Sequence, residues 1–204
     1  MARMRAVSCE GGELSLVDLP DPEPGPGQLV LRVRRTGICG SDLHARRHAD
    51  ELAAVMDELA YAHSIRSTEP TVLGHELCGE VVAQGRGTAR SFPLGSRVVA
   101  FPLVRGTEGV HPVGLSPLAP GGYAEQVLVE ASMSHRVPDA LDDDLAALTA
   151  GSHATAGPTW WWTPGWSPRG RRPPAAGGVR RRRSCSTSRS APWSDCAGCP
   201  AGST

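Results

Sequence analysis

The sequence predicts a mainly β domain with short helices over residues 1–150 and a disordered tail over residues 151–204. Short apolar stretches alternate with Gly- and Pro-rich turns in the first part, a pattern typical of β-rich domains. The tail contains no Leu, Ile, Met, Phe or Tyr, so it lacks the apolar surface needed to offset the entropy of ordering. The charge divides at the same place, because the first part has a formal charge of −7 and the tail one of +7.

Three strands are predicted ahead of residue 40. Residues 5–9 and 14–19 form a pair joined by the turn EGGE. The Pro- and Gly-rich segment 20–27 forms a loop, and residues 28–38 alternate between apolar and polar side chains as a half-buried strand does. This third strand is expected to end at the stretch GICGSDLH.

A change of period marks residues 48–62 as a short amphipathic helix. Leu52, Val55, Met56 and Leu59 fall at positions i, i+3, i+4 and i+7, which places them on one face of a helix. We expect this face to dock onto the body of the domain, and a role as a lid is the alternative.

The remaining part of the domain returns to short strands and then ends in a helix. Strands are predicted at 79–84, 97–103 and 122–130, with turns between them. A helix is expected to begin at residue 141, with Asp139 as its N-cap and three acidic residues in its first turn.

Charge, hydropathy and cysteine usage limit the classes of protein. A formal net charge of zero argues neither for nor against a nucleic-acid partner. The longest apolar run, residues 98–104, is far shorter than the roughly 20 residues that cross a bilayer, and the N-terminus lacks the apolar core of a signal peptide. The cysteines show no framework typical of secreted proteins. We therefore expect a cytoplasmic protein without a membrane partner, in which Cys9, Cys39 and Cys78 are thiols.

Two short stretches gather residue types that bind metal ions. They contain Cys39, Ser41, Asp42 and His44 in GICGSDLH, and His75 and Glu76 in GHE. Catalytic zinc takes three protein ligands and keeps an open position, and thiolates and imidazoles are among its preferred donors. Spacing alone leaves two other interpretations open, an ordinary turn that carries charges and an ordinary buried thiol at Cys39. Cys78 is interpreted as a core residue rather than a ligand.

Several motifs follow one another in a fixed order along residues 3–150. They are GICGSDLH, VLGHELCGEVVAQG, GSRVVAF, APGGYAEQVLV and ALDDDLAALT. The pattern G-H-E-x-x-G-x-x-x-x-x-G fits at Gly74, His75, Glu76, Gly79 and Gly85. In this order the motifs resemble the zinc-containing medium-chain alcohol dehydrogenase family. The resemblance covers the family's GroES-like catalytic domain and implies a partly open β-barrel.

The resemblance implies a catalytic zinc site. Cys39 and His75 correspond to two of the zinc ligands, and Glu76 corresponds to the carboxylate that sits beside the zinc and ligates it transiently. Zinc acts there as a Lewis acid that lowers the pKa of an alcohol. The glycines around GHE are expected to turn the backbone tightly, so that His75 and Glu76 face the metal.

The resemblance also implies a proton relay and a reaction. Ser41 corresponds to the hydroxyl that takes the alcohol proton, His44 to a further relay to solvent, and Asp42 to the carboxylate that orients the ligand histidine. Members of the family transfer hydride between a secondary alcohol or polyol and NAD(P), and they form homo-oligomers. The implied cofactors are therefore Zn²⁺ and NAD(P), and the implied partner is a small-molecule alcohol or polyol.

The sequence departs from the family pattern in three places. Ala150 stands where a ligating Glu is expected, and His153 is a poor substitute for it. Residues 86–130 contain no Cys, so the four-cysteine structural zinc lobe of many members is absent. No G-x-G-x-x-G motif lies between a strand and a helix, so the nucleotide-binding Rossmann domain is missing.

The abrupt change of composition near residue 150 leads to the hypothesis that the tail is the product of a frameshift or a fused deletion. The predicted function is a zinc-dependent oxidoreductase catalytic domain, and a non-catalytic zinc-binding remnant is the alternative. A basic-tailed binding protein is a third interpretation, although nucleic acid is not expected as a partner. Cys196 and Cys199 form a lone CxxC that we attribute to chance, because a zinc knuckle needs two more ligands.

Overall fold

A computed structural model describes residues 2–156, with side chains for residues 2–150. The elements in chain order are β1 (Arg3–Glu10), β2 (Glu13–Pro20), β3 (Gln28–Gly37), α1 (Gly40–Arg47), α2 (Ala49–Glu58), β4 (Thr71–Val72), β5 (Glu76–Gln84), β6 (Arg97–Ala100), β7 (Leu103–Gly106), β8 (Gly109–Pro112), β9 (Gln126–Glu130), the 3₁₀ turn η1 (Ala131–Met133), β10 (Ser134–Arg136) and α3 (Asp143–Ala156). The tail predicted to be disordered lies outside the described residues, except that α3 continues past the predicted boundary at residue 150.

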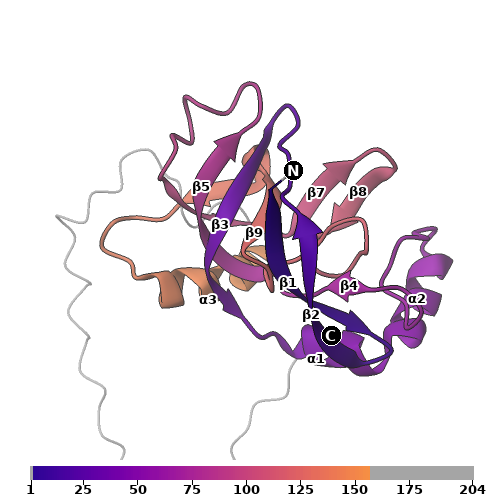
Figure 1. Cartoon of the computed structure of the whole chain (residues 1–204). Helices are drawn as coiled ribbons and strands as arrows, with labels where there is room; N and C mark the ends of the chain where they lie inside the picture. The colour runs from indigo at the N-terminus through magenta and orange to yellow at the C-terminus, as the bar shows by residue number, and fades with distance from the viewer. Residues whose placement is uncertain (1, 157–204) are drawn as a thin grey trace, which may run out of the picture. The chain divides into compact units, whose positions relative to one another are not determined.

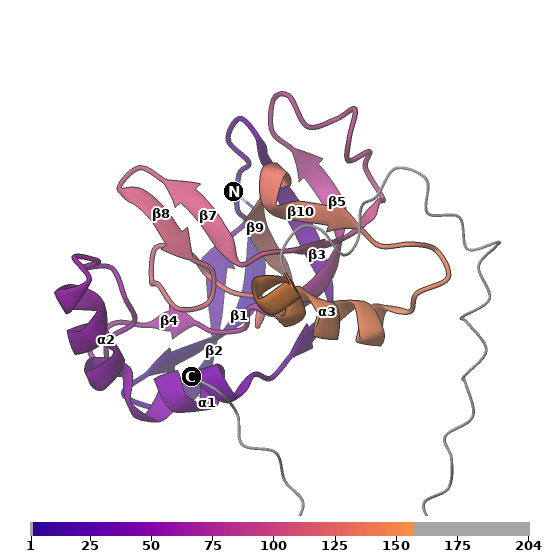
Figure 2. The same cartoon turned by 180° about the vertical axis from the view of Figure 1, so that it is seen from behind.

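The strands form three antiparallel sheets in the body of the domain (Figure 1). Their orders are β2-β1-β4, β10-β6-β5-β3-β9 and β7-β8, and the described strands close into no complete barrel. This confirms the expectation of a mainly β, open fold with short helices. Figure 2 shows α3 lying across the five-stranded sheet, whereas α1 and α2 sit at the end of the domain near β4. No helix among the described residues is long and apolar enough to cross a bilayer.

The main core is built from side chains of the five-stranded sheet and of the segment around β7 and β8. Its members are Leu29, Leu31, Leu77, Val81, Phe92, Val98, Ala100, Val104, Val113, Ala119, Val127 and Val129. Strand β3 contributes heavily because it lies between β5 and β9, and its first four residues are all buried. The pairing of β3 with β5 also positions the metal-type ligands, since Gly37 at the end of β3 is opposite Glu76 at the start of β5.

Helix α1 is an element that the sequence analysis missed, because GICGSDLH was expected only to end a strand. The helix begins right after Cys39, whose backbone N–H donates to the Asp42 carboxylate at 3.0 Å. A carboxylate three residues into a helix that binds back to the N-cap backbone is one half of a capping box. The same side chain that starts the helix therefore also fixes the backbone of Cys39.

Helix α2 forms where residues 48–62 predicted a helix, but the expected apolar face is only partly correct. Ala49 and Ala53 are the buried residues of α2, whereas Val55 and Leu59 beside them are 55% and 70% exposed. Ala49 packs in a core cluster with Ile65, and Leu52 of the predicted face packs partly buried against the same cluster. The contact is thus made by Leu52 of the predicted face and by the alanines beside that face, whereas Val55 and Leu59 stay exposed.

The ends of several other elements also differ from expectation. Helix α3 is capped by Asp142, whose carboxylate accepts the Leu145 N–H at 2.8 Å, and not by Asp139. The strand expected over 97–103 ends at Ala100, and the short β7–β8 hairpin follows it. Strands of three or four residues such as β7, β8 and β10 are too short to show a clear period.

Asp143 at the start of α3 joins the helix to the sheet, and its replacement by Asn should weaken the domain. Arg97 Nη1 lies 2.8 Å from this carboxylate and Arg34 Nε 2.6 Å from it, and both arginines hold its pKa below the usual value. A lowered carboxyl pKa stabilises the fold at neutral pH, and that stability is lost as the pH falls through the folded-state pKa. Since Arg34 is exposed to solvent, we expect Asp143→Asn to cost about 1 kcal/mol.

Thermal unfolding measures this cost as a loss of about 4 °C at pH 7. The difference from wild type should shrink as the pH falls below about 4, the ordinary range of an Asp carboxyl. Asp139→Asn is the matched control, because Asp139 is exposed and does not cap the helix. Equal midpoints for the two variants at pH 7 would show that Asp143 does not hold α3 in place.

Candidate metal centre

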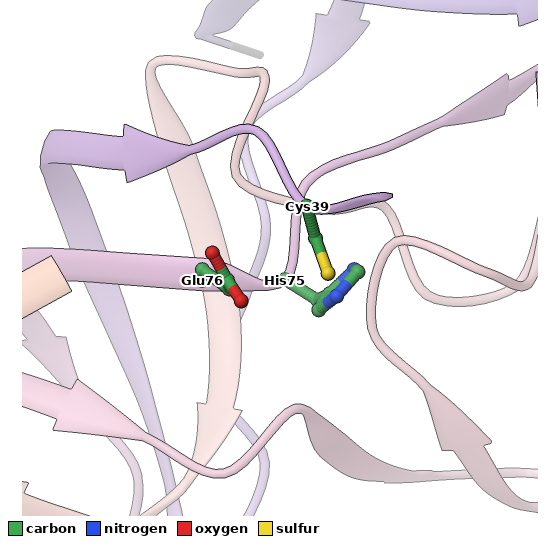
Figure 3. A group of neighbouring side chains, drawn as sticks. All are labelled: Cys39, His75 and Glu76. Carbon is green, nitrogen blue, oxygen red and sulfur yellow. The ribbon is translucent and has the colours of Figure 1, made fainter. Parts of the chain in front are cut away.

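Three side chains with metal-binding atoms meet at the end of the β3–β5 pair (Figure 3). One ligand atom each from Cys39, His75 and Glu76 lies within 4.8 Å of the others, and all three residues are partly buried. Among the described residues this is the only group of three such side chains at that spacing. The structure therefore brings together the three residues that the sequence analysis named as metal ligands.

The chain reaches this arrangement through a tight turn at Gly74. Gly74 has a φ of +95°, a conformation that strains any residue with a Cβ. A Cβ on Gly74 would also lie 2.7 Å from Cδ1 of Tyr123, so only glycine leaves room for that ring. The turn directs His75 and Glu76 toward Cys39, which comes from the loop between β3 and α1.

The buried carboxylate of Asp42 links the separate parts of the centre. Its Oδ2 accepts the Cys39 N–H at 3.0 Å, and its Oδ1 accepts the Gly74 N–H at 3.1 Å. Oδ1 also lies 3.2 Å from Nδ1 of His75, although that buried nitrogen is not aligned for a full hydrogen bond. Asp42 thus fixes the backbone on both sides of the centre and faces one nitrogen of the imidazole.

Hydrogen bonds and charges around the centre raise the pKa of His75 and lower the pKa of Cys39. The Asp42 carboxylate raises the pKa of His75 to about 9, and the Cys39 thiol adds to this shift. Hydrogen bonds from the side chain and backbone of Ser41, and then from His75, lower the pKa of Cys39. A thiolate beside an imidazole is a donor set that zinc binds well, and metal binding displaces the remaining protons.

The raised pKa of His75 predicts a pH dependence for the metal-free protein. Because the folded-state pKa lies above the unfolded value, the stabilisation is present below about 6.5 and is lost as the pH rises through about 9. Urea unfolding of chelator-treated protein should therefore show wild type losing more stability between these pH values than His75→Gln. Parallel pH profiles for the two proteins would contradict the raised pKa.

The two relay residues lie at different distances from the centre. Ser41 Oγ is 3.1 Å from Nε2 of His75, so this hydroxyl is part of the cluster. His44 lies one helical turn further along α1, where its ring stacks on that of His48 with centroids 4.8 Å apart. The structure thus places Ser41 against the imidazole and His44 on the exposed part of the helix.

The third-ligand position and the nearby thiol belong to the core. Ala150 is fully buried and packs with Cys78 and Val99 between α3 and the sheet. Burial raises the pKa of Cys78 to about 11, so Cys78 is a protonated core thiol, as expected. The side chain of His153 lies outside the described residues. Within the described part of the chain, the third side chain that lies close to Cys39 and His75 is therefore Glu76.

Tyr123 is a residue of this centre that the sequence analysis did not single out. Its hydroxyl donates to Oδ2 of Asp42 at 3.1 Å, and its ring lies against the backbone of Gly74. The residue lies in the stretch APGGYAEQVLV, but nothing in the local pattern distinguishes it from a tyrosine that only fills space. The contact joins segments 81 residues apart, so only the tertiary structure reveals it.

Comparison with known proteins agrees with the fold. Residues 25–139 match the sequence model of the alcohol dehydrogenase GroES-like domain. The chain belongs to this family. Members are zinc- and NAD(P)-dependent oxidoreductases.

Two relatives show how much of a full-length protein of this family the chain covers. It is 37% identical to L-threonine 3-dehydrogenase of Streptomyces avermitilis, over 71% of the chain and 43% of that protein. With the Alteromonas mediterranea enzyme of the same name it shares 32% identity, over 65% of the chain and 39% of the relative. The chain therefore spans less than half the length of these relatives.

Two solved oxidoreductase structures share this architecture. Acetophenone reductase of Geotrichum candidum, solved in complex with NAD, is 26% identical and has a TM-score of 0.57, with 72% of this chain and 44% of that one covered. 2R,3R-butanediol dehydrogenase of Bacillus subtilis is 27% identical and has a TM-score of 0.54, with 71% and 43% covered. Both confirm that residues of the described domain adopt the catalytic-domain fold of the family.

Proposed function

We propose that this chain is the metal- and alcohol-binding half of a zinc-dependent, NAD(P)-linked alcohol or polyol dehydrogenase. The convergence of Cys39, His75 and Glu76 within 4.8 Å, at the end of a GroES-like domain, is the observation that carries the proposal. The alcohol substrate rests on the dehydrogenase relatives, whose full length this chain does not span, and the hydride acceptor rests on the family and on a structural neighbour solved with NAD.

The residues present fit a zinc ion. Cys39 offers a thiolate, Glu76 a carboxylate, and His75 a ring nitrogen, which are the three donor types of zinc sites. Asp42 faces Nδ1 of His75, so Nε2 is the nitrogen left to bind a metal. When bound, zinc supplies a Lewis acid that lowers the pKa of a substrate alcohol.

The side chains beside the metal position would carry the proton of the alcohol. We assign to Ser41 the hydroxyl that takes this proton, because Oγ lies 3.1 Å from the nitrogen that would bind the metal. His44, exposed on the same helix, is the group that passes the proton on to solvent. We assign Glu76 as the third donor. The position on α3 where the family resemblance expects a ligating Glu is occupied by the buried Ala150.

A non-catalytic zinc-binding domain is the second candidate, favoured by the absence of a G-x-G-x-x-G motif from the sequence. The two functions differ in cofactor binding. A dehydrogenase must bind NADH or NADPH saturably and reduce NAD(P)⁺ with a secondary alcohol, whereas a zinc-binding domain binds the metal alone.

The test measures both properties on the full chain loaded with zinc. Fluorescence titration with NADH and NADPH reports binding, and absorbance at the reduced-nicotinamide band reports turnover of a panel of secondary alcohols and diols. Saturable binding with turnover supports the dehydrogenase. Zinc binding without either supports the second candidate, and a steep salt dependence of RNA or DNA binding that disappears without residues 151–204 would support a basic-tailed binding protein instead.

A further inference from the structure

Backbone hydrogen bonds join the segment before β9, at Gly122 and Tyr123, to the turn at Gly74. Gly122 N–H donates to Gly74 O at 2.7 Å, and Tyr123 N–H donates to Leu73 O at 3.0 Å. Val7 of β1 in turn donates to Tyr123 O at 2.7 Å. Backbone hydrogen bonds on both sides therefore fix where Tyr123 lies relative to Gly74.

The Tyr123 ring and hydroxyl use this position in two different ways. The ring occupies the space that a Cβ on Gly74 would need. The hydroxyl reaches past it and donates to Asp42 Oδ2 at 3.1 Å, while the carbonyl of Gly37 is further away at 3.4 Å. A hydrogen bond to an ionised acceptor is stronger than one to a neutral carbonyl, so the carboxylate is the main partner of this hydroxyl.

The two oxygens of Asp42 consequently have different tasks. Oδ2 accepts from Tyr123 and from the Cys39 backbone, whereas Oδ1 accepts from the Gly74 backbone and faces His75. The side chain of Asp42 is only 2% exposed, so water does not compete for these positions. A donor that holds Oδ2 prevents the carboxylate from rotating away from the imidazole.

We propose that Tyr123 is a positioning residue of the metal centre. It holds the Asp42 carboxylate in the orientation that directs His75 toward the metal. This inference rests on the proposed function, because it assumes that Cys39, His75 and Glu76 hold a metal ion. Partners of metal-binding histidines typically contribute 10- to 100-fold to metal affinity, and Tyr123 acts one bond further out, so we expect an effect of about ten-fold.

Tyr123→Phe tests the proposal because it removes the hydroxyl and keeps the ring against Gly74. Tyr61→Phe is the matched control. Tyr61 is the only other tyrosine of the chain, and its hydroxyl also binds an imidazole, that of His111 on β8, at 3.0 Å. Both variants lose one partly buried hydroxyl that contacts a polar partner, but only one of them lies at the centre.

The measurement is a titration of the full-length, metal-free chain with Co²⁺, followed by its thiolate-to-cobalt and d–d absorption bands. We expect Tyr123→Phe to bind Co²⁺ about ten-fold more weakly and with shifted d–d bands, while Tyr61→Phe matches wild type. Thermal unfolding of the metal-free proteins shows whether each variant folds like wild type. The band positions are the decisive readout, since a purely structural role of Tyr123 would not alter the geometry of the bound ion.

The other outcomes overturn the inference in distinguishable ways. Wild-type affinity and wild-type bands in Tyr123→Phe would show that the hydroxyl does not position the centre. A loss of affinity with unchanged bands would assign Tyr123 a role in stability alone. If wild type binds Co²⁺ with no thiolate-to-cobalt band, or does not bind it, the proposed function fails and this inference fails with it.

Discussion

His75→Ala is expected to lower the zinc affinity of the chain by at least about 100-fold. His75 provides the only imidazole of the donor group, and the two atoms that remain, from Cys39 and Glu76, do not make the three protein ligands of a catalytic zinc site. Changes to residues behind a ligand already cost 10- to 100-fold, so the loss of a ligand itself should cost more. Competition with a chromophoric chelator at pH 7.5 measures the dissociation constants.

Cys78→Ser is the control for the companion variant Cys39→Ser. Both variants replace a thiol that lies near the start of β5. Cys78 differs because it is fully buried in the core, where its pKa is raised to about 11 and it stays protonated. We expect Cys39→Ser to lose zinc as His75→Ala does, and Cys78→Ser to keep it. Zinc binding at wild-type affinity by Cys39→Ser or His75→Ala would contradict the assigned donors.

Gly74→Ala is expected to destabilise the domain by about 3 kcal/mol and to abolish metal binding. The backbone of Gly74 has a φ of +95°, which an L-residue adopts only with strain of order 1–3 kcal/mol. The added Cβ would in addition lie 2.7 Å from the Tyr123 ring. Either the turn or the ring must move, and both carry contacts to Asp42.

Gly87→Ala separates the two causes. Its φ of +92° is nearly the same, but a Cβ there meets nothing within 4 Å. We therefore expect Gly87→Ala to cost only the backbone strain, about 1 kcal/mol, and to leave zinc binding unchanged. Urea unfolding and zinc titration of both variants check this. Equal losses of stability in the two proteins would show that the packing of Tyr123 on Gly74 contributes nothing.

The three side chains that converge at the centre could be named from the sequence because they lie in dense local motifs. Cys39 lies two residues after the end of β3, His75 directly precedes β5 and Glu76 begins it, so the order of motifs was enough to name them. The glycines of the GHE pattern were predicted to turn the backbone. The structure adds which neighbouring atom each glycine allows to approach. Gly79 lets Leu31 approach, since a Cβ would be 2.8 Å from that side chain, and Gly85 lets the Gly25 carbonyl approach.

Features that depend on distant contacts were not predictable in the same way. Helix α1 begins with a polar, glycine-containing stretch whose helical conformation depends on Asp42 binding back to Cys39. The buried face of α2 depends on which side of the helix meets the body, and there small alanines allowed closer packing than Val55 and Leu59. The cap of α3 shifted from Asp139 to Asp142 because the chain enters the helix after one more turn.

The interior of the segment between 86 and 130 illustrates the same limit. The sequence showed that this segment contains no Cys, but not that part of it forms the β7–β8 hairpin. Buried polar contacts such as that of Tyr61 with His111 join the hairpin to the loop after α2, across 50 residues of sequence. The local pattern of apolar and polar residues does not predict a contact of this kind.

The zinc content of the purified full-length chain tests the central claim most directly. The protein would be dialysed against metal-free buffer without chelator, and its zinc measured by plasma mass spectrometry alongside Cys39→Ser prepared in parallel. The donor group of Cys39, His75 and Glu76 predicts one zinc ion per wild-type chain and none in the variant. Wild-type protein that is folded, yet retains no zinc and takes up none when it is supplied, would contradict the claim.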